Sequence, residues 1–449
     1  MKRRLLSGGV WTVATKIVAG ASGFAVNAVL ARLLAPEDLG AYFLLVSAAS
    51  VGAMMSQLGM QVALVRLVSE ALAQGNGARA RGYIRSALCV VAVAATGLGV
   101  LMAWSGGEMA LRIFHSAALA EIAWLGGAWL AGLAVTNLVA EAFRGLHDYR
   151  VAGVLSGAGS NLLMLATLGL IVPIWDRAGL LLVTGLGAAA VILSAVAGLV
   201  MLRRRTSHFG PADTVSVRQM LAVSLPLLVT SLAIFVSTHA DLWILGMYRS
   251  PDEVGIYGAA VRLVQLVLMP MLMMNAILAP AISEQFSQGH RVRLERLLRG
   301  SAALAGLPAL GALIVIGLAA SPLLGWIYGD AYRSGATALL WVSAGQVANV
   351  LCGSAAVVLM MTGHQRAAMV ISVLTGAGLI AGGMLTVDRY GMNGVAAVTG
   401  LMTAAHGLLC AVWVNRVLGI RTYCDWLGIA DVAARVRLAL RTGGNDSGS

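Results

Sequence analysis

The chain consists of long apolar stretches separated by short polar connections. Stretches of about 20 apolar residues can cross a lipid bilayer as helices. We predict twelve such spans, at 8–34, 39–64, 84–104, 118–140, 151–172, 180–202, 220–247, 255–280, 301–325, 336–361, 368–387 and 394–414. No segment between them is long enough to fold as a separate domain. The pattern therefore predicts an all-α polytopic membrane protein.

The composition supports this fold class and excludes several functions. Of the 449 residues, 59% are hydrophobic and 11% are charged, whereas soluble domains carry about 25% charged residues. A soluble enzyme, a DNA-binding protein and a disordered chain are thereby excluded. The four cysteines do not bracket an exported loop, so a disulfide framework is not expected. A Walker A sequence is also absent.

The net charge of +12 reflects how the basic residues are distributed between the two sides of the membrane. With the N-terminus inside, the cytoplasmic segments hold 23 Lys and Arg residues and the outer loops hold 6. The positive-inside rule then predicts that both termini are cytoplasmic. The tail at 425–441 alternates apolar and basic residues with helical spacing and is predicted to lie on the inner membrane surface. Lys16 and Arg262 remain inside predicted spans.

An internal duplication divides the chain into two halves. The sequence from Pro36 to Tyr42 (PEDLGAY) recurs from Pro251 to Tyr257 (PDEVGIY), and two weaker matches have nearly the same offset. Because six spans is an even number, both copies enter the membrane from the same side, as a parallel repeat around a central cavity. The predicted domains are a six-helix bundle at 1–205, a cytoplasmic linker at 206–219, a second six-helix bundle at 220–416 and a cytoplasmic tail at 417–449.

The repeated PEDLG-type turn has a structural and a functional interpretation. Proline suits the first turn of a helix, and acidic residues favour its positive N-terminal end. An acidic pair in a first outer loop is also typical of membrane glycosyltransferases. The shortness of the loop and its duplication favour the structural interpretation.

Polar residues recur inside the spans at helical spacing, along spans 1, 2, 7 and 8. Charged groups in lipid are costly and usually face a cavity or a partner. If the equivalent spans of the two halves face each other, their polar stripes line a cationic cavity that suits an anionic substrate. The alternative is that Asp241 only pairs with Lys or Arg to hold helices together. The candidate cavity residues are Lys16, Asn27, Gln57, Gln61, Asp241, Arg262 and Gln265.

Spacing indicates no catalytic constellation, metal site or cofactor site, so the chain is not expected to be an enzyme. Asp241 and His239 are candidates for coupling to a proton or cation. A hydrogen-bonded structural role for His239 fits the sequence equally well.

Several ordered motifs resemble those of polysaccharide-type flippases in the multidrug/oligosaccharidyl-lipid/polysaccharide exporter superfamily. One is the helix 1–2 turn, from Ala31 to Tyr42. Others are Leu64-Val65-Arg66 with Glu70, the sequence from Phe143 to His147, and the sequence from Met361 to Arg366. The resemblance extends from about Trp11 to Arg416.

The resemblance implies transport of an undecaprenyl-pyrophosphate-linked oligosaccharide from the inner to the outer leaflet of the bacterial cytoplasmic membrane, for O-antigen, capsule or exopolysaccharide synthesis. It implies alternating access, with Lys16 and Arg262 as cationic cavity residues. A polysaccharide polymerase and a chain-length regulator are the implied protein partners. The motif residues Arg66, Glu70, Arg144 and His147 would form the cytoplasmic entrance.

Three other classes compete with this interpretation. A multidrug antiporter of the same superfamily would need cavity acids for cationic drugs, but the spans hold one acid against two cations. A major-facilitator transporter would usually carry a Gly-x-x-x-Asp-Arg-x-Gly-Arg-Arg loop after helix 2, which is missing between Arg66 and Arg85. A membrane polymerase or glycosyltransferase would normally need a larger outer loop than this sequence offers.

Overall fold

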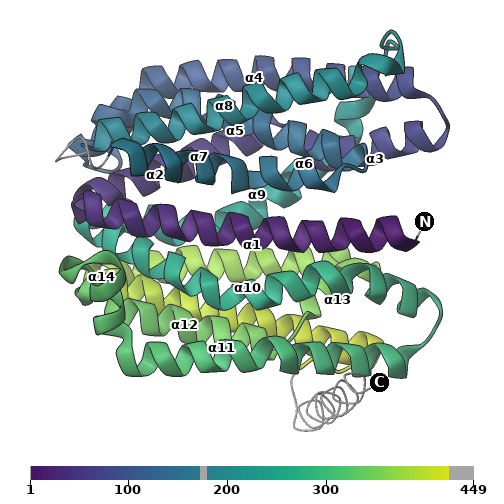
Figure 1. Ribbon diagram of the computed structural model, residues 1–449. Helices are drawn as coiled ribbons and strands as arrows, with labels where there is room; N and C mark the ends of the chain where they lie inside the picture. The colour runs from purple at the N-terminus through teal and green to yellow at the C-terminus, as the bar shows by residue number, and fades with distance from the viewer. Residues whose placement is uncertain (1, 172–178, 424–449) are drawn as a thin grey trace, which may run out of the picture. The chain divides into compact units, whose positions relative to one another are not determined.

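A computed structural model describes residues 2–171 and 179–423, and the described residues form helices with no strand (Figure 1). The all-α prediction is therefore confirmed. The predicted amphipathic tail at 425–441 lies outside the described residues. Contacts divide the chain into two compact units, Met1–Ala259 with Gly325–Tyr332, and Ala260–Leu324 with Arg333–Ser449.

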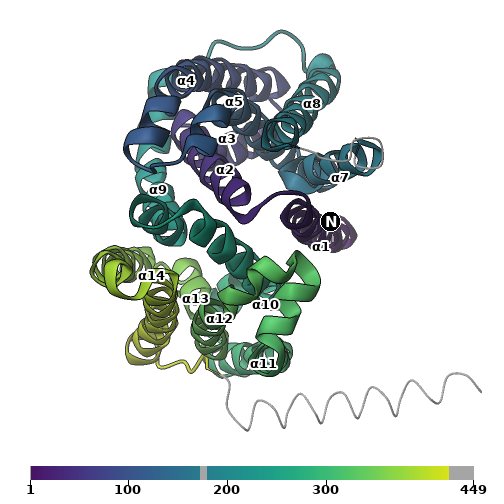
Figure 2. The same cartoon turned by 90° about the vertical axis from the view of Figure 1, so that its left-hand side faces the viewer.

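In the first unit, α5 is the central helix and contacts α2, α3, α4, α6 and α8 (Figure 2). The elements of this unit are α1 (Lys2–Leu33), α2 (Pro36–Ser56), α3 (Met60–Ala73), α4 (Gly77–Arg112), α5 (Ala117–Gly145), α6 (Tyr149–Gly153), the π-helix η1 (Val154–Ala158), α7 (Gly159–Ile171), α8 (Leu180–Thr206), the 3₁₀ turn η2 (Ser207–Phe209), α9 (Val217–Tyr248), the start of α10 (Pro251–Ser287) and the later segment Gly325–Tyr332.

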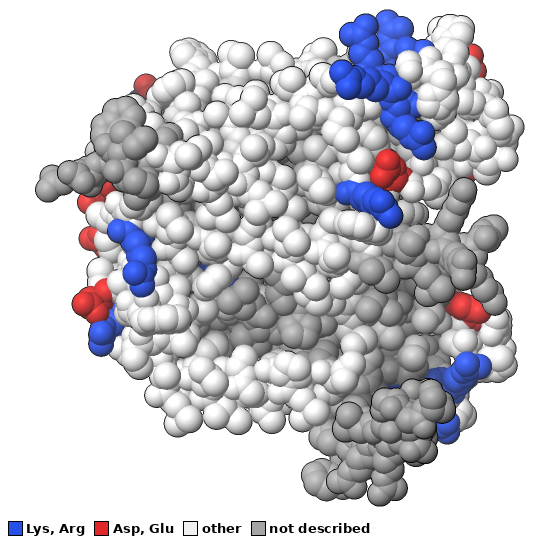
Figure 3. All heavy atoms as spheres, in the orientation of Figure 1, with Lys and Arg blue, Asp and Glu red and all other residues white. Residues whose placement is uncertain are grey.

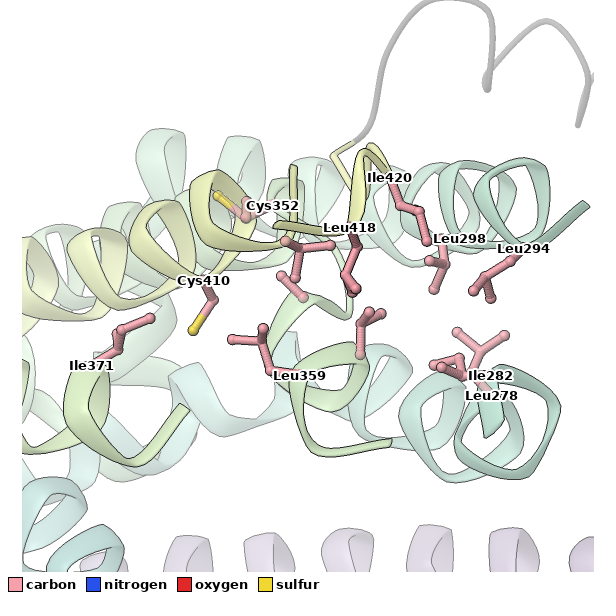
Figure 4. Packing of buried hydrophobic residues seen from close by; sticks show 14 residues of the cluster. Leu278, Ile282, Leu294, Leu298, Cys352, Leu359, Ile371, Cys410, Leu418 and Ile420 are labelled. Atoms are coloured by element: carbon pink, nitrogen blue, oxygen red, sulfur yellow. The ribbon is translucent and has the colours of Figure 1, made fainter. Parts of the chain in front are cut away.

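The second unit holds the rest of α10, most of α11 (Arg291–Tyr328), the end of η3 (Asp330–Gly335), α12 (Ala336–Leu351), α13 (Ala355–Met361) and α14 (Gln365–Leu418). Leu278, Leu298, Leu359 and Leu418 belong to its buried core, to which α10, α11, α13 and α14 contribute (Figure 4). Ile420, just after α14, is part of the same core and is 1% exposed. The last described residues therefore pack against this unit.

Each of the twelve predicted spans coincides with helical structure, but spans 2, 5 and 10 are broken and span 9 bends at Ala319. Span 2 is divided between α2 and α3, span 5 contains η1, and span 10 is divided between α12 and α13. Spans 11 and 12 are both in α14, which bends at Gly391 (φ 55°, ψ −141°). Among the described residues, eight helices are long and apolar enough to cross a membrane, or nine if the bent pair formed by Asp330–Leu351 and Ala355–Met361 is one span. The count of twelve stays a prediction, as do the proposed domain bounds.

The structural interpretation of the repeated turn agrees with the helix starts. Helix α2 begins at Pro36 with Glu37 and Asp38 in its first turn. Helix α10 begins at Pro251 with two acidic residues in the same positions. Proline at this position loses no backbone bond, and the carboxylates lie at the positive end of the helix dipole.

Candidate functional site

The acid predicted inside the membrane, Asp241, is held by a tyrosine. Its side chain on α9 is 5% exposed, and one carboxyl oxygen accepts a hydrogen bond of 2.6 Å from the Tyr257 hydroxyl on α10. The other oxygen accepts a 2.8 Å bond from the Leu242 backbone N–H. A buried carboxyl needs such donors because it is removed from water. Tyr257, the last residue of the second repeated turn, was not among the predicted site residues.

His239, the other candidate for ion coupling, is half-buried on the same helix. Its ring stacks on Phe235 with a centroid distance of 4.0 Å, and Nδ1 lies 3.2 Å from the Phe235 carbonyl oxygen. These contacts fit a ring held against its own helix. A role in coupling stays a prediction.

The polar stripe on α1 contains one exposed cation and one amide bonded to its own helix. Lys16 is exposed, and the Asn27 Nδ2 donates to the Gly23 carbonyl at 2.7 Å. The adjoining face of α1 packs on the broken span 5. There Asn161 of α7 donates to the Ala19 carbonyl at 3.2 Å, and Gly153 of α6 lies against Thr15.

Gln57 and Gln61 were expected on one continuous helical stripe, but they lie on opposite sides of a break. Gln57 follows the end of α2, while Gln61 is in α3. Between them, Leu58 (φ 50°) and Gly59 (φ 73°) adopt left-handed backbone conformations that end the helical register. Gln57 is 1% exposed and donates to the Ala134 carbonyl at 3.4 Å, and its Oε1 has no hydrogen-bond partner among the described residues.

The second unit contributes the remaining two predicted cavity residues. Arg262 is half-buried and Gln265 is exposed, both on α10 beyond Ala259. The other predicted cavity residues, Lys16, Asn27, Gln57, Gln61 and Asp241, belong to the first unit. Their convergence on one cavity stays a prediction.

Three of the four predicted entrance residues lie on α3 and α5, which pack together, and the fourth follows the end of α5. On α3, the exposed Arg66 and Glu70 form an ion pair of 2.7 Å, which raises the pKa of the Arg66 guanidinium. The neighbouring Ser69 donates to the Gly145 carbonyl at the end of α5 at 3.2 Å. The exposed His147 follows directly, with a left-handed backbone (φ 61°).

Arg144, the fourth of these residues, connects the end of α5 to the broken span. Its guanidinium donates to the Glu141 carboxylate and, at 2.8 Å, to the Ser156 hydroxyl. Ser156 and Gly157 (φ 108°, ψ −28°) have non-helical backbones inside η1. Arg144 therefore supports a point where the backbone departs from the helix.

Charged side chains are sparse on the face in Figure 3 and lie mainly towards the ends of the helices. Among the residues that the structure describes, no cluster of three or more His, Cys, Asp or Glu residues could hold a metal ion.

Residues 5–286 match the family described as "Polysaccharide biosynthesis protein", and residues 226–380 match the MatE family. The chain is 22% identical over 424 residues to the "Probable low-salt glycan biosynthesis flippase Agl15" of Haloferax volcanii, covering 90% of this chain and 82% of the relative.

Two solved structures share the fold at low sequence identity. The lipid II flippase MurJ in an inward closed conformation has a TM-score of 0.74 at 12% identity, covering 96% of this chain and 92% of MurJ. An inward-facing multidrug resistance MATE transporter of the MOP superfamily has a TM-score of 0.72 at 15% identity, covering 92% of this chain and 98% of the transporter.

These matches confirm a multi-pass membrane protein with the two-lobe transporter fold of the multidrug/oligosaccharidyl-lipid/polysaccharide exporter superfamily. The matched proteins are flippases and transporters, in agreement with the prediction that the chain is not an enzyme. The match over residues 5–286 covers more than half of the 449 residues, and the chain therefore belongs to the polysaccharide biosynthesis protein family.

Proposed function

We propose that the chain is a flippase that carries an undecaprenyl-pyrophosphate-linked oligosaccharide from the inner to the outer leaflet of a bacterial cytoplasmic membrane. The observation that carries the proposal is the similarity to a glycan-biosynthesis flippase over 90% of the chain. The family match and the superfamily fold support it. The product would serve O-antigen, capsule or exopolysaccharide synthesis, alongside a polymerase and a chain-length regulator.

The proposed mechanism is alternating access around a cationic cavity. A pyrophosphate headgroup must leave water to cross the bilayer, and fixed positive charges reduce the cost of that transfer. Arg262 offers a planar fork for two phosphate oxygens, while Lys16 offers a compact charge on a flexible stem. The exposed Lys16 and Gln265 and the half-buried Arg262 are compatible with contact to a substrate. The lipid tail would stay in the bilayer.

The charged corner formed by α3 and the end of α5 is the proposed cytoplasmic entrance. Arg66, Arg144 and His147 place basic groups there, with Glu70 as the partner of Arg66. This assignment depends on the predicted orientation, with both termini in the cytoplasm. Asp241, with His239 nearby on α9, is the proposed site of coupling to an ion gradient.

The test is deletion of the gene, followed by mass spectrometry of undecaprenyl-linked intermediates. We expect complete oligosaccharide units to accumulate on the inner leaflet and to disappear when the wild-type chain is restored. A polymerase mutant would instead accumulate single units on the outer leaflet. A deletion strain with an unchanged lipid-linked pool and normal surface polysaccharide would refute the proposal.

A multidrug antiporter is the second candidate function. It is favoured by the MatE match over residues 226–380 and by the fold shared with a MATE transporter. In that case, deletion would leave the lipid-linked pool unchanged and would increase sensitivity to cationic drugs.

A further inference from the structure

The ends of two helices from the second half of the sequence belong to the first compact unit. They are the start of α10, up to Ala259, and the end of α11, from Gly325. Both adjoin connections that are predicted to face the outside of the membrane. In this unit they meet the end of α1 and the start of α2.

The two copies of the repeated turn meet at their glycines. A Cβ atom added to Gly40 would lie 2.9 Å from the Gly255 backbone nitrogen and would overlap the Pro251 carbonyl oxygen. A Cβ atom added to Gly255 would lie 3.1 Å from the Gly40 nitrogen and would overlap the Pro36 carbonyl oxygen. The helix starts of α2 and α10 therefore cross with their backbones in contact, and only glycine fits at the two central positions.

The end of α11 is held by a cation from α1. The Arg32 Nε donates to the Ile327 carbonyl at 2.9 Å, and a terminal guanidinium nitrogen donates to the Trp326 carbonyl. The last carbonyls of a helix lack partners within the helix and lie at its negative end, so a guanidinium satisfies both needs. Nearby, Tyr328 packs edge-on against Phe24 with ring centroids 6.2 Å apart.

The Arg32 bonds are open to water. Arg32 is exposed and lines a pocket of about 430 Å³ together with Pro36, Asp330 and Tyr332. A charged hydrogen bond that water can replace contributes little to stability and breaks at low cost. This contact is therefore suited to repeated opening and closing.

A bend in α11 comes just before the segment that Arg32 holds. Ala319 has a non-helical backbone (φ −134°, ψ 24°), and Pro322 lies one turn later. Proline has no N–H to donate to the carbonyl four residues earlier, and it bends helices. The boundary between the compact units follows at Leu324 and Gly325. The last turn of α11 can thus change its contacts without moving the whole helix.

We propose that the Gly40–Gly255 crossing and the Arg32 bonds to Trp326 and Ile327 form a reversible outer closure. The closure blocks the outer side while substrate enters from the cytoplasm, and it must separate before substrate leaves. This inference depends on the proposed function and on the predicted orientation.

The first test uses a cysteine pair beside the crossing, Glu37→Cys with Asp252→Cys, in a variant whose four native cysteines are replaced by alanine. Both positions are exposed in the first turns of α2 and α10. In lipid vesicles, spin labels on the two cysteines should be separated mainly by a short distance. Added lipid-linked oligosaccharide should populate a longer distance between the labels. A reducible cross-link should abolish translocation until it is reduced. The control pair, Glu108→Cys with Arg112→Cys on α4, should have no effect when cross-linked.

The second test needs no substrate. Replacing an exposed charge that caps a helix end changes an equilibrium by about two- to fivefold, so Arg32→Ala should raise the long-distance population by about that factor. Arg32→Lys should restore part of the closure, and Gly311→Ala, at a position with open space around it, should leave the distances unchanged.

The two tests separate this inference from the proposed function. If Arg32→Ala lengthens the distance in a protein that moves no glycan, the closure stands and the substrate assignment fails. If the cross-linked protein translocates glycan at the normal rate, or if Arg32→Ala leaves the distances unchanged, the closure is wrong.

Discussion

At the scale of single residues, the hydrogen bond from Tyr257 lowers the free-energy cost of burying the Asp241 carboxyl. The carboxyl is bonded to a hydroxyl and a backbone N–H. Neither donor adds a charge, so the residue can bind or release a cation without breaking an internal ion pair with its donors. A coupling role for Asp241 stays a prediction.

Removing the Tyr257 hydroxyl should therefore weaken the fold. Tyr257→Phe leaves one oxygen of a 5%-exposed carboxyl without its 2.6 Å donor, which should cost about 1–3 kcal/mol of unfolding free energy. Thermal unfolding in detergent measures the effect. Tyr248→Phe, at an exposed position of α9, the helix that carries Asp241, is the control and should change little. Equal stability of both variants would show that the hydrogen bond is unimportant.

The two intramembrane cations should be required for transport but not for folding. Lys16→Ala and Arg262→Ala should each abolish surface polysaccharide at normal protein levels, because the headgroup loses a counter-charge. Arg112→Ala, in a predicted outer loop, is the control and should retain transport. Immunoblots and polysaccharide staining of complemented deletion strains provide the readout. Normal polysaccharide in the Lys16→Ala/Arg262→Ala double variant would contradict the cavity assignment.

Sequence reasoning found the acid but not its partner. The spacing of polar residues places side chains on one face of a helix, and this was enough to select Asp241. Which neighbouring helix supplies the hydroxyl depends on packing between helices. The repetition of the turn that ends in Tyr42 and Tyr257 is the available signal, but the helix-start pattern explains only its proline and acidic residues.

At the scale of the helices, interrupted spans are the main difference from the sequence prediction. The predicted spans 2, 5 and 10 are apolar enough to be predicted as continuous helices, yet they break near Gly59, Gly157 and Gly353, all with positive φ. Hydropathy reports which residues can lie in lipid and carries little information on backbone dihedrals. Non-helical backbone at membrane depth is tolerated where protein or water satisfies its polar groups.

The break in span 5 should depend on the backbone freedom of Gly157. Neither Gly157 nor Gly169 has an atom within 4 Å of an added Cβ, but only Gly157 has a positive φ. Gly157→Ala should destabilise the protein by about 1–2 kcal/mol. Gly169→Ala, in the regular helix α7, should be neutral or slightly stabilising. Thermal unfolding of both variants checks this contrast, and similar losses would mean that crowding matters more than backbone strain.

At the scale of the whole chain, the segment after α14 holds part of the second unit together. The Thr422 hydroxyl donates to the Cys352 carbonyl at 3.0 Å, at the break between α12 and α13. Ile420 enters the core that α10, α11, α13 and α14 share. The segment thus covers part of the core of this unit.

Ile420→Ala should consequently destabilise the second unit. Truncating a side chain that is 1% exposed leaves a cavity in the core, at a cost of about 2–5 kcal/mol. Leu401→Ala, at a position 63% exposed, is the control and should have a small effect. Hydrogen exchange of α12 and α14 reports the loss locally. Unchanged exchange rates in Ile420→Ala would show that the segment packs against the core without stabilising it.

The duplication was visible in the sequence, but the meeting of the two repeated turns was not. An offset between motifs shows that two segments are similar and says nothing about whether they touch. The glycine at the fifth position of each turn contributes no polar or apolar signal to a periodicity argument, although it is the residue that the contact requires.

The Gly40–Gly255 crossing also bears on how such a chain can arise. Each turn presents to the other the same surface that it receives, as in an isologous interface between identical subunits. A single six-helix ancestor carrying one such turn could therefore have paired with a second copy of itself through this contact. Fusion of the two gene copies would then have kept this contact. Mutation of the glycine in one half would be constrained by the glycine it contacts in the other half.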